Sequence, residues 1–338
     1  MSWGMIGLSS VTDVFSDMLK ANRVPHGLLL CGPEGSGRAS LALSLAQALN
    51  CHSPEPDFSP CRKCGPCVRI SQELFPDVMT LEPKGRGDVI PIDDVRKLID
   101  VLNYSPVEGR YKVAIIKKAD RFRQEGGGAL LKTLEEPVEN TVLIMTAQSE
   151  SGVMDTLVSR CVRLRVPTLT RKQIIEALHE KGLDQMTSRL LAGLSDGALG
   201  AALSVDPAYA MELWSALDGI LGQHGTKNAL KSALDWVRSF VDAIEKNKTK
   251  TESDRDKSDF VLDCLRLWWR DVFVLAATKD AGRMAGPPPT PSQRRWADQI
   301  AADDVARIEA LNAGLQDGLS RAMRLELLFV NYWLNVLK

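Results

Sequence analysis

Residues 32–40 read Gly-Pro-Glu-Gly-Ser-Gly-Arg-Ala-Ser and resemble a phosphate-binding loop. In the pattern G-x-x-x-x-G-K-[ST], backbone N–H groups cradle phosphates, the lysine reaches them, and the hydroxyl holds Mg²⁺. Gly32, Gly35 and Gly37 keep the glycine-rich frame, but Arg38 replaces the lysine and Ala39 replaces the hydroxyl residue. An arginine can still bind a phosphate oxygen, whereas alanine has no ligand for a metal. The loop therefore predicts a relative of ATPases that does not hydrolyse ATP.

Two interpretations of this loop stay open. It binds a nucleotide weakly and without metal, or it is only a tight turn between a strand and a helix, which is the interpretation we favour. Productive nucleotide binding is not expected under either one.

A second constellation consists of cysteines in the spacing C-x9-C-x2-C-x2-C, namely Cys51, Cys61, Cys64 and Cys67. Four thiolates complete a tetrahedron and leave no open coordination position, which is typical of structural Zn²⁺. An iron–sulfur cluster, which also uses four cysteines, is the alternative. His52 could substitute for one ligand, but four cysteines suffice. We therefore expect one structural zinc ion per chain.

Composition limits the remaining classes. The 338 residues suffice for two or three domains, and 44% are hydrophobic, as in ordinary folded proteins. With 42 basic and 43 acidic residues the formal net charge is −1, so no global basic field attracts nucleic acid. No apolar run is long enough to span a membrane, and residues 1–10 lack the features of a signal peptide. A cytoplasmic location is the expectation.

Short apolar runs alternate with helical patterns up to residue 166. The expected strands are His26–Cys31, Val78–Leu81, Lys112–Ile116, Thr141–Ala147 and Val162–Val166. The expected helices between them are Arg38–Leu49, Ile92–Tyr104 and Gly128–Glu136. Strands that alternate with helices predict an α/β fold in which a parallel sheet is covered on both faces. Because glycine disfavours helix, Gly126-Gly127-Gly128 predict a frayed or looped start of the third helix.

Beyond residue 166 the strand pattern ends. Three short helices are expected at Arg171–Lys181, Met186–Leu194 and from about Gly197. From residue 208 onward, apolar residues recur at helical spacing and predict long amphipathic helices.

Several strings together resemble one family, the clamp-loader subunits of bacterial DNA polymerase III, which are of the AAA+ class. They are Phe75-Pro76-Asp77, Ser105-Pro106-Val107-Glu108-Gly109, Tyr111–Ile116, Ala129-Leu130-Leu131-Lys132-Thr133-Leu134-Glu135-Glu136-Pro137 and Ser159-Arg160-Cys161. The degenerate phosphate loop is similar to that of the delta-prime type rather than the ATP-hydrolysing gamma/tau type.

The resemblance implies three domains. Residues 1–166 would form a P-loop NTPase-like AAA+ domain with a parallel five-stranded sheet and a zinc module at about 50–68. Residues 167–206 would form a small helical lid, and residues 207–338 an all-α collar that holds a hetero-oligomeric ring. The implied partners are gamma/tau-type ATPase subunits, the delta subunit and, through the complex, the sliding clamp and primed DNA.

The resemblance also implies how the chain would act. Active relatives carry an acidic pair after the third strand, where this chain has Lys117-Lys118, and an arginine in the lid, where it has Gly197-Ala198-Leu199-Gly200. Thr146 or Gln148 would occupy the polar sensor position. In the string Ser159-Arg160-Cys161, Arg160 would be an arginine finger that completes the ATP site of a neighbouring subunit, and Ser159 is the second candidate catalytic residue. The chain alone would then be no enzyme, although it would be a component of the polymerase holoenzyme.

Two other interpretations remain. The chain could be an ATP-hydrolysing gamma/tau-type subunit with a variant loop, or a zinc-containing DNA-binding or repair factor. A scaffold without a role in trans is a variant of the family assignment, and substitution of Arg160 distinguishes it.

Overall fold

The computed structural model describes residues 2–85, 88–223, 228–246, 254–320 and 325–336. Packing divides the chain into two units: residues 1–173 with 197–201, and residues 174–196 with 202–338. The expected division into an AAA+ domain, a lid and a collar stays a prediction.

The first unit is built on a five-stranded parallel sheet in the order β2-β3-β4-β1-β5. Its strands are β1 (Gly27–Cys31), β2 (Val78–Leu81), β3 (Lys112–Ile116), β4 (Thr141–Ala147) and β5 (Val162–Arg165). The predicted strands are therefore confirmed, with ends that differ by one residue at β1 and β5. The central strands are buried because helices cover both faces, which explains why they read as continuous apolar runs.

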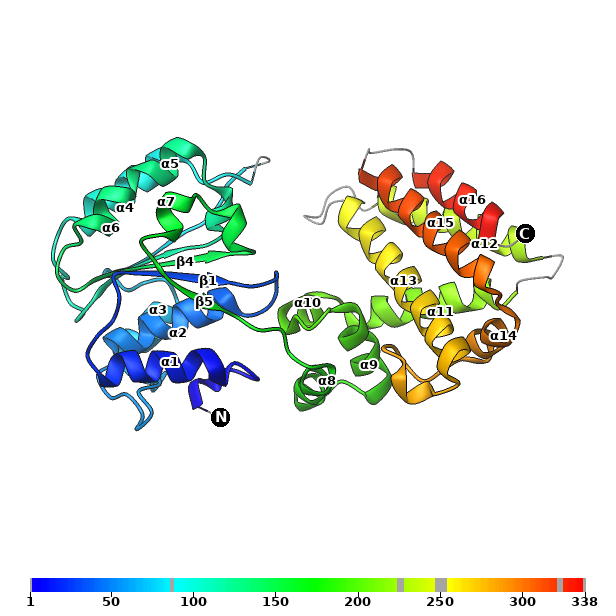
Figure 1. Cartoon of the computed structure of the whole chain (residues 1–338), viewed down its shortest axis with the longest axis horizontal. Helices are drawn as coiled ribbons and strands as arrows, with labels where there is room; N and C mark the ends of the chain where they lie inside the picture. The colour runs from blue at the N-terminus through cyan, green and yellow to red at the C-terminus, as the bar shows by residue number, and fades with distance from the viewer. Residues whose placement is uncertain (1, 86–87, 224–227, 247–253, 321–324, 337–338) are drawn as a thin grey trace. The chain divides into compact units, whose positions relative to one another are not determined.

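Helices of the first unit lie on the two faces of this sheet, as Figure 1 shows. One face carries α4 (Ile92–Leu102), α5 (Gln124–Ala129), α6 (Leu131–Glu135) and α7 (Asp155–Val158). The other face carries α1 (Ser9–Lys20), α2 (Arg38–Asn50) and α3 (Gly65–Ser71). Short 3-10 turns lie at η1 (Ser2–Gly4), η2 (Ala119–Arg121) and η3 (Glu150–Gly152).

One cluster of buried apolar side chains joins the sheet to the helices on its α4 face. Val95, Leu98 and Leu102 project at helical spacing from α4 and pack with Leu134 and Leu157 of the neighbouring helices. These contacts pack the ends of α6 and α7 against the core. Residues of the candidate site lie at both of these helix ends.

The expectation for the glycine triplet was wrong. Gly126, Gly127 and Gly128 all lie within α5, and a break at Leu130 separates α5 from α6. A Cβ atom on Gly127 would lie 2.3 Å from Sδ of Met154, so the glycine permits a close approach between α5 and the segment before α7. Tertiary packing therefore overrides the low helix propensity of glycine.

The second unit is helical. It contains most of α8 (Arg171–Glu180), which begins in the first unit, and α9 (Gln185–Leu194), α11 (Pro207–Leu221), α12 (Ala229–Lys246), α13 (Asp254–Thr278), η4 (Ala281–Arg283), α14 (Pro291–Gln299), α15 (Ala302–Ser320) and α16 (Leu325–Val336). The short α10 (Leu199–Ser204) begins in the first unit and ends in the second. The three short helices and the long amphipathic ones are as predicted.

The core of the second unit is aromatic. Trp268 and Trp269 of α13 are both buried, and Trp269 packs edge-on against Trp296 of α14 with ring centroids 4.9 Å apart. No helix among the described residues is long and apolar enough to cross a membrane.

Candidate functional site

The phosphate-binding-like loop connects the carboxyl end of β1 to the start of α2, the place where ligands bind in open α/β sheets. Gly35 and Gly37 have φ angles of +75° and +94°, which favour glycine, and Gly37 is the N-cap of α2. Gly32 is needed for a different reason, because a Cβ atom there would lie 2.7 Å from the carbonyl oxygen of Val166. The three predicted glycines therefore shape the turn.

Arg38, the residue in the lysine position, is only 8% exposed. Its Nη1 atom and the hydroxyl of Ser36 are buried without a hydrogen-bond partner among the described residues. Burial lowers the pKa of Arg38, and the charge of Asp120 opposes that shift. Ala39 is exposed at the start of α2 and offers no metal ligand. The loop thus keeps one cationic hydrogen-bond donor, the guanidinium of Arg38, but it lacks the side-chain hydroxyl that would bind Mg²⁺.

The start of α10 covers the same loop. The backbone N–H of Gly200 donates to the carbonyl oxygen of Gly35 over 2.8 Å. A Cβ atom on Gly35 would lie 2.6 Å from the backbone nitrogen of Ala201, and one on Gly200 would lie 2.8 Å from the oxygen of Gly35. The segment in which active relatives would carry an arginine therefore lies with its backbone directly on the loop.

The end of β3 places a cation where active relatives would hold acidic residues. Lys118 has its ammonium 3.7 Å from Glu34 of the loop and 3.5 Å from Asp88, and Lys117 pairs with Glu82 at 3.0 Å. The backbone N–H of Lys118 donates to the hydroxyl of Thr146, which is therefore engaged within the fold. Gln148, the other predicted sensor, is exposed.

The four predicted cysteines meet between the end of α2 and the start of α3. Their sulfur atoms all lie within 4.8 Å of one another, and the Sγ atoms of Cys51 and Cys64 are 3.9 Å apart. Zinc–sulfur bonds of about 2.3 Å in a tetrahedron require sulfur separations of about 3.8 Å, so the arrangement can hold a zinc ion. Cys51 and Cys67 are fully buried, and Cys61 and Cys64 are half-buried.

Backbone donors and burial act on these thiols in opposite directions. N–H groups of Lys63 and Cys64 lower the pKa of Cys61 to about 6, whereas burial raises the pKa of Cys51 and Cys67. A cation bound to all four sulfurs would stabilise the thiolates that burial disfavours. The side chain of Gln47 in α2 also donates to the carbonyl oxygen of Cys67 over 2.8 Å, which ties the cluster to the core.

Arg160 lies between α7 and β5, at the amino end of the sheet. Its carbonyl oxygen would be 3.1 Å from a Cβ atom on Gly27, the first residue of β1. The phosphate loop follows the last residue of the same strand, and a strand of this length spans about 15 Å. The structure therefore places Arg160, the predicted arginine finger, and the phosphate loop of the same chain at opposite ends of the sheet.

The side chain of Arg160 is 35% exposed, and its guanidinium is bound by Glu135, the last residue of α6. Nε donates to Oε1 of Glu135 over 2.8 Å, and Nη1 donates to the hydroxyl of Ser159 over 3.2 Å. Sequence reasoning did not assign a role to Glu135. Its position in the string Leu-Leu-Lys-Thr-Leu-Glu-Glu-Pro was visible, but only the tertiary fold brings it to Arg160.

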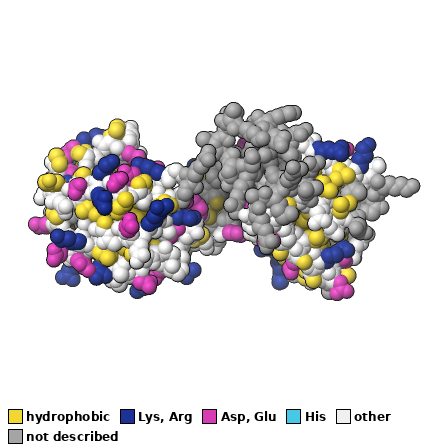
Figure 2. Space-filling model, turned by 90° about the horizontal axis from the view of Figure 1, so that it is seen from above, with side chains coloured by type: hydrophobic (Ala, Val, Ile, Leu, Met, Phe, Trp, Pro, Cys, Tyr) yellow, Lys and Arg dark blue, Asp and Glu magenta, His cyan; other side chains and the backbone are white. Residues whose placement is uncertain are grey.

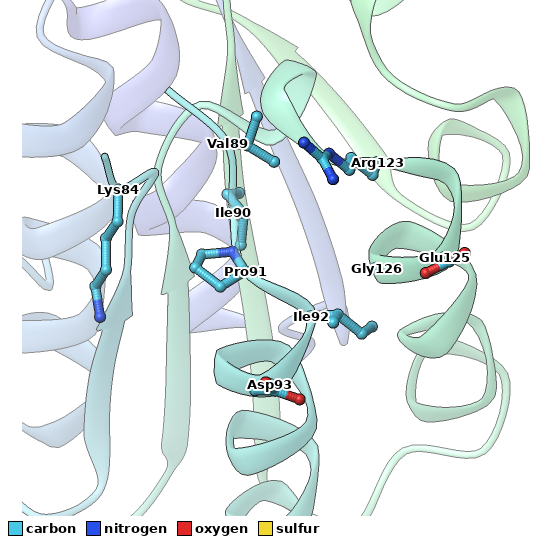
Figure 3. Close-up of a pocket in the computed structure, with 9 residues that line it drawn as sticks. All are labelled: Lys84, Val89, Ile90, Pro91, Ile92, Asp93, Arg123, Glu125 and Gly126. Carbon is cyan, nitrogen blue, oxygen red and sulfur yellow. The ribbon is translucent and has the colours of Figure 1, made fainter. Parts of the chain in front are cut away.

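A pocket of about 390 Å³ lies elsewhere in the first unit, between the segment after β2 and the starts of α4 and α5. In Figure 3 its apolar centre, Val89 to Ile92, lies between Lys84 and Arg123. Its charged residues are of both signs, since Asp93 and Glu125 also line it. The face in Figure 2 likewise shows basic and acidic side chains interspersed on the described part. Neither the pocket nor this surface adds side chains that converge on the candidate site.

Comparison with known proteins finds several with similar sequences. The family model described as "DNA polymerase III, delta subunit" matches residues 7–170. The chain is 31% identical over 207 residues to DNA polymerase III subunit tau of Escherichia coli K12, covering 60% of this chain and 32% of that protein. It is 34% identical over 334 residues to DNA polymerase III subunit gamma/tau of Mycobacterium bovis, covering 93% and 56% of the two chains.

Among solved structures, a DNA polymerase III gamma subunit-related protein of Thermotoga maritima is 18% identical, covers 97% of each chain and has a TM-score of 0.48. The chain spans between 32% and 56% of the length of the two curated relatives named above. Residues 7–170 of this chain match the DNA polymerase III delta-subunit family model, and the chain is similar in sequence to tau and gamma/tau subunits of that polymerase.

Proposed function

We propose that this chain is a catalytically silent, delta-prime-type subunit of the DNA polymerase III clamp loader. In a ring with gamma/tau-type ATPase subunits and the delta subunit, it would help to load the sliding clamp onto primed DNA. The cysteine cluster would hold a structural zinc ion and would take no part in the reaction.

The silent state is supported by three features of the loop region. Ala39 provides no hydroxyl for Mg²⁺, and the ammonium of Lys118 lies near Glu34, where it would repel a divalent cation. The backbone of Gly200 also lies on the loop at Gly35. Each feature alone is expected to weaken ATP hydrolysis: the loop offers no hydroxyl to Mg²⁺, a cation lies beside it, and the start of α10 contacts it.

A role in trans is supported by the place of Arg160. Its exposed guanidinium lies at the amino end of the sheet, whereas the phosphate loop lies at the carboxyl end, so Arg160 cannot complete the site of its own chain. An arginine that reaches a neighbour's ATP would stabilise the charge that develops on the γ-phosphate. In GTPases such fingers contribute rate factors of about 10³–10⁵.

The experiment is steady-state ATP hydrolysis by the ATPase subunits reconstituted with delta, clamp and primed DNA. Rings with the wild-type chain, with Arg160→Ala and without added chain are compared after assembly is verified by gel filtration. We expect the wild-type chain to stimulate ATP hydrolysis. The assembled ring with Arg160→Ala should hydrolyse ATP at least about tenfold more slowly than the wild-type ring. Equal turnover in both assembled rings would show that the chain is a scaffold.

A second candidate is an ATP-hydrolysing gamma/tau-type subunit, which the names of the curated relatives favour. It requires Arg38 to replace the lysine and another group to hold Mg²⁺ near Lys118. ATP turnover by the isolated chain, abolished by Arg38→Ala, would support this candidate and contradict the silent subunit.

A further inference from the structure

The guanidinium of Arg160 is held on more than one side by groups of its own chain. Nε and Nη2 both donate to Oε1 of Glu135, over 2.8 and 2.5 Å. Nη1 donates to the carbonyl oxygen of Thr156 over 2.9 Å and to the hydroxyl of Ser159 over 3.2 Å. That hydroxyl in turn donates to the carbonyl oxygen of Thr156 over 3.2 Å. The side chain therefore has a defined orientation although it is partly exposed.

The number of N–H donors on the Arg160 guanidinium shows how many of them remain to bind a ligand. A guanidinium has five N–H groups in a planar fork. The four contacts engage the Nε–H, both groups on Nη1 and one on Nη2. One N–H on Nη2 has no acceptor among the described residues of this chain. A phosphate oxygen of another molecule can therefore be bound without breaking any contact that orients the arginine.

The groups that hold Arg160 are themselves anchored in the core. Glu135 follows Leu134, and Thr156 precedes Leu157; both leucines belong to the core cluster on the α4 face of the sheet. The N–H of Glu136 donates to the carbonyl oxygen of Lys132 over 2.9 Å, which closes the last turn of α6. Glu135 is therefore presented from a fixed helix end.

We propose that Glu135 is a positioning residue for Arg160, which fixes the Nε edge of the guanidinium so that the remaining Nη2–H points to the nucleotide of a neighbouring subunit. This inference rests on the proposed trans role of Arg160. Ser159 supports the same orientation from the Nη1 side.

The negative charge of Glu135 has an opposing effect, because it partly neutralises the cation that acts on the phosphate. The side chains of Arg160 and Glu135 are 35% and 49% exposed, so water screens this effect. Orientation is not screened, and small misplacements of catalytic groups reduce rates strongly. Loss of Glu135 is therefore expected to slow the reaction rather than to accelerate it.

The test uses the reconstituted ring with Glu135→Ala, Glu135→Gln, Glu136→Ala and Arg160→Ala. Glu136 is the matched control, because it is the adjacent exposed glutamate and has no ion pair among the described residues. We expect Glu135→Ala to lower kcat about tenfold with KM for ATP unchanged, since the finger acts in the transition state. Glu135→Gln should retain most of the rate because its amide oxygen still accepts from Nε, and Glu136→Ala should match the wild type.

Two outcomes of this assay would overturn the inference while leaving the trans role intact. They are a rate in Glu135→Ala equal to or above that of the wild type, or an equal loss in Glu136→Ala, each together with a clear loss in Arg160→Ala. An unchanged rate in Arg160→Ala would instead refute the trans role itself.

A second measurement needs only the isolated chain. The Nε–H of Arg160, identified by its absence in Arg160→Ala, should exchange slowly with water in the NMR spectrum of the wild type. Exchange should become at least about tenfold faster in Glu135→Ala and stay slow in Glu136→Ala, because only Glu135 accepts this hydrogen bond. Equal exchange in the wild type and Glu135→Ala would show that Glu135 does not hold the arginine.

Discussion

The backbone N–H of Gly200 donates to the carbonyl oxygen of Gly35 over 2.8 Å, so the start of α10 lies directly on the phosphate loop. Two glycines make this approach because neither has a Cβ atom to hold the backbones apart. The contact thus holds the segment around Gly200 directly against the loop that precedes α2.

Enlarging Gly200 should therefore destabilise the first unit. In Gly200→Ala the new Cβ atom would meet the oxygen and Cα of Gly35 at 2.8 and 3.0 Å, and backbone atoms cannot give way as a flexible side chain can. We expect a loss of about 1–3 kcal/mol, seen as a lower Tm in calorimetry.

Gly128→Ala is the control for that change. Gly128 also lies in a helix of the first unit, but outside its chain neighbours and the backbone of its own helix no atom lies within 4 Å of the position of its Cβ. Alanine there should leave the Tm unchanged or raise it, because alanine is the better helix former. A Tm for Gly200→Ala as high as that of Gly128→Ala would show that the contact with Gly35 is not tight.

Metal content tests the cysteine cluster. We expect about one zinc per wild-type chain by mass spectrometry and a loss of zinc and thermal stability in Cys67→Ser, since a structural site needs its four ligands. Cys161→Ser, which alters a thiol outside the cluster, should keep the zinc. A wild-type chain that contains iron, or no metal, would exclude a zinc site.

Zinc binding should also weaken on acidification. The thiols must lose protons to bind, and burial already raises the pKa of Cys51 and Cys67. Protons therefore compete with the metal more strongly as the pH falls. Competition with a chelator between pH 8 and 6 should show an apparent zinc affinity that decreases steadily, and an affinity independent of pH would contradict thiolate ligation.

Asp77 should make stability depend on pH in the acid range. It is fully buried and accepts the N–H groups of Val107, Glu108 and Gly109 at 2.7–2.8 Å, with Lys112 at 4.0 Å. Burial alone would raise its pKa, but these donors and the lysine lower it overall. Its stabilising effect is therefore present above the unfolded pKa of about 3.9 and is lost as the pH falls through the lower folded pKa.

Asp77→Asn removes this carboxylate and leaves Lys112 buried without its counter-charge. We expect a loss of about 3 kcal/mol at pH 7, measured by urea unfolding, and a smaller further loss below pH 4 than in the wild type. Asp93→Asn, at a residue that is 78% exposed, should change stability little. Equal effects of the two substitutions would show that burial of Asp77 is unimportant.

Tyr332 should stabilise the second unit through its hydroxyl. The buried hydroxyl accepts the Nε1–H of Trp269 and donates to Oδ1 of Asn312, both over 3.0 Å, and burial raises the pKa of Tyr332. Tyr332→Phe leaves both partners buried and unsatisfied, and we expect a loss of about 1–3 kcal/mol in thermal or urea unfolding. Tyr104→Phe, at a residue 71% exposed, should be neutral, and a neutral Tyr332→Phe would mean that water replaces the hydroxyl.

The sequence by itself determined the elements of the first unit and the chemistry of its motifs. Branched apolar runs such as Lys112–Ile116 and Thr141–Ala147 favour a buried strand, because they are short, rich in branched residues and apolar on both faces. The spacing of Cys61, Cys64 and Cys67 likewise brings three sulfurs together through local geometry alone. Such features depend on residues close in the chain, and they could be predicted.

Only the tertiary structure decided which distant residues meet. The helix through Gly126–Gly128 forms because Gly127 packs against Met154, and the loop is covered because Gly200 reaches Gly35 across more than 160 residues. Glu135 contacts Arg160 only because α6 and α7 pack on the same core. Arg160 and the phosphate loop are far apart because they lie at opposite ends of the sheet. These relations depend on strand order and on packing, which side-chain patterns along a single chain do not encode.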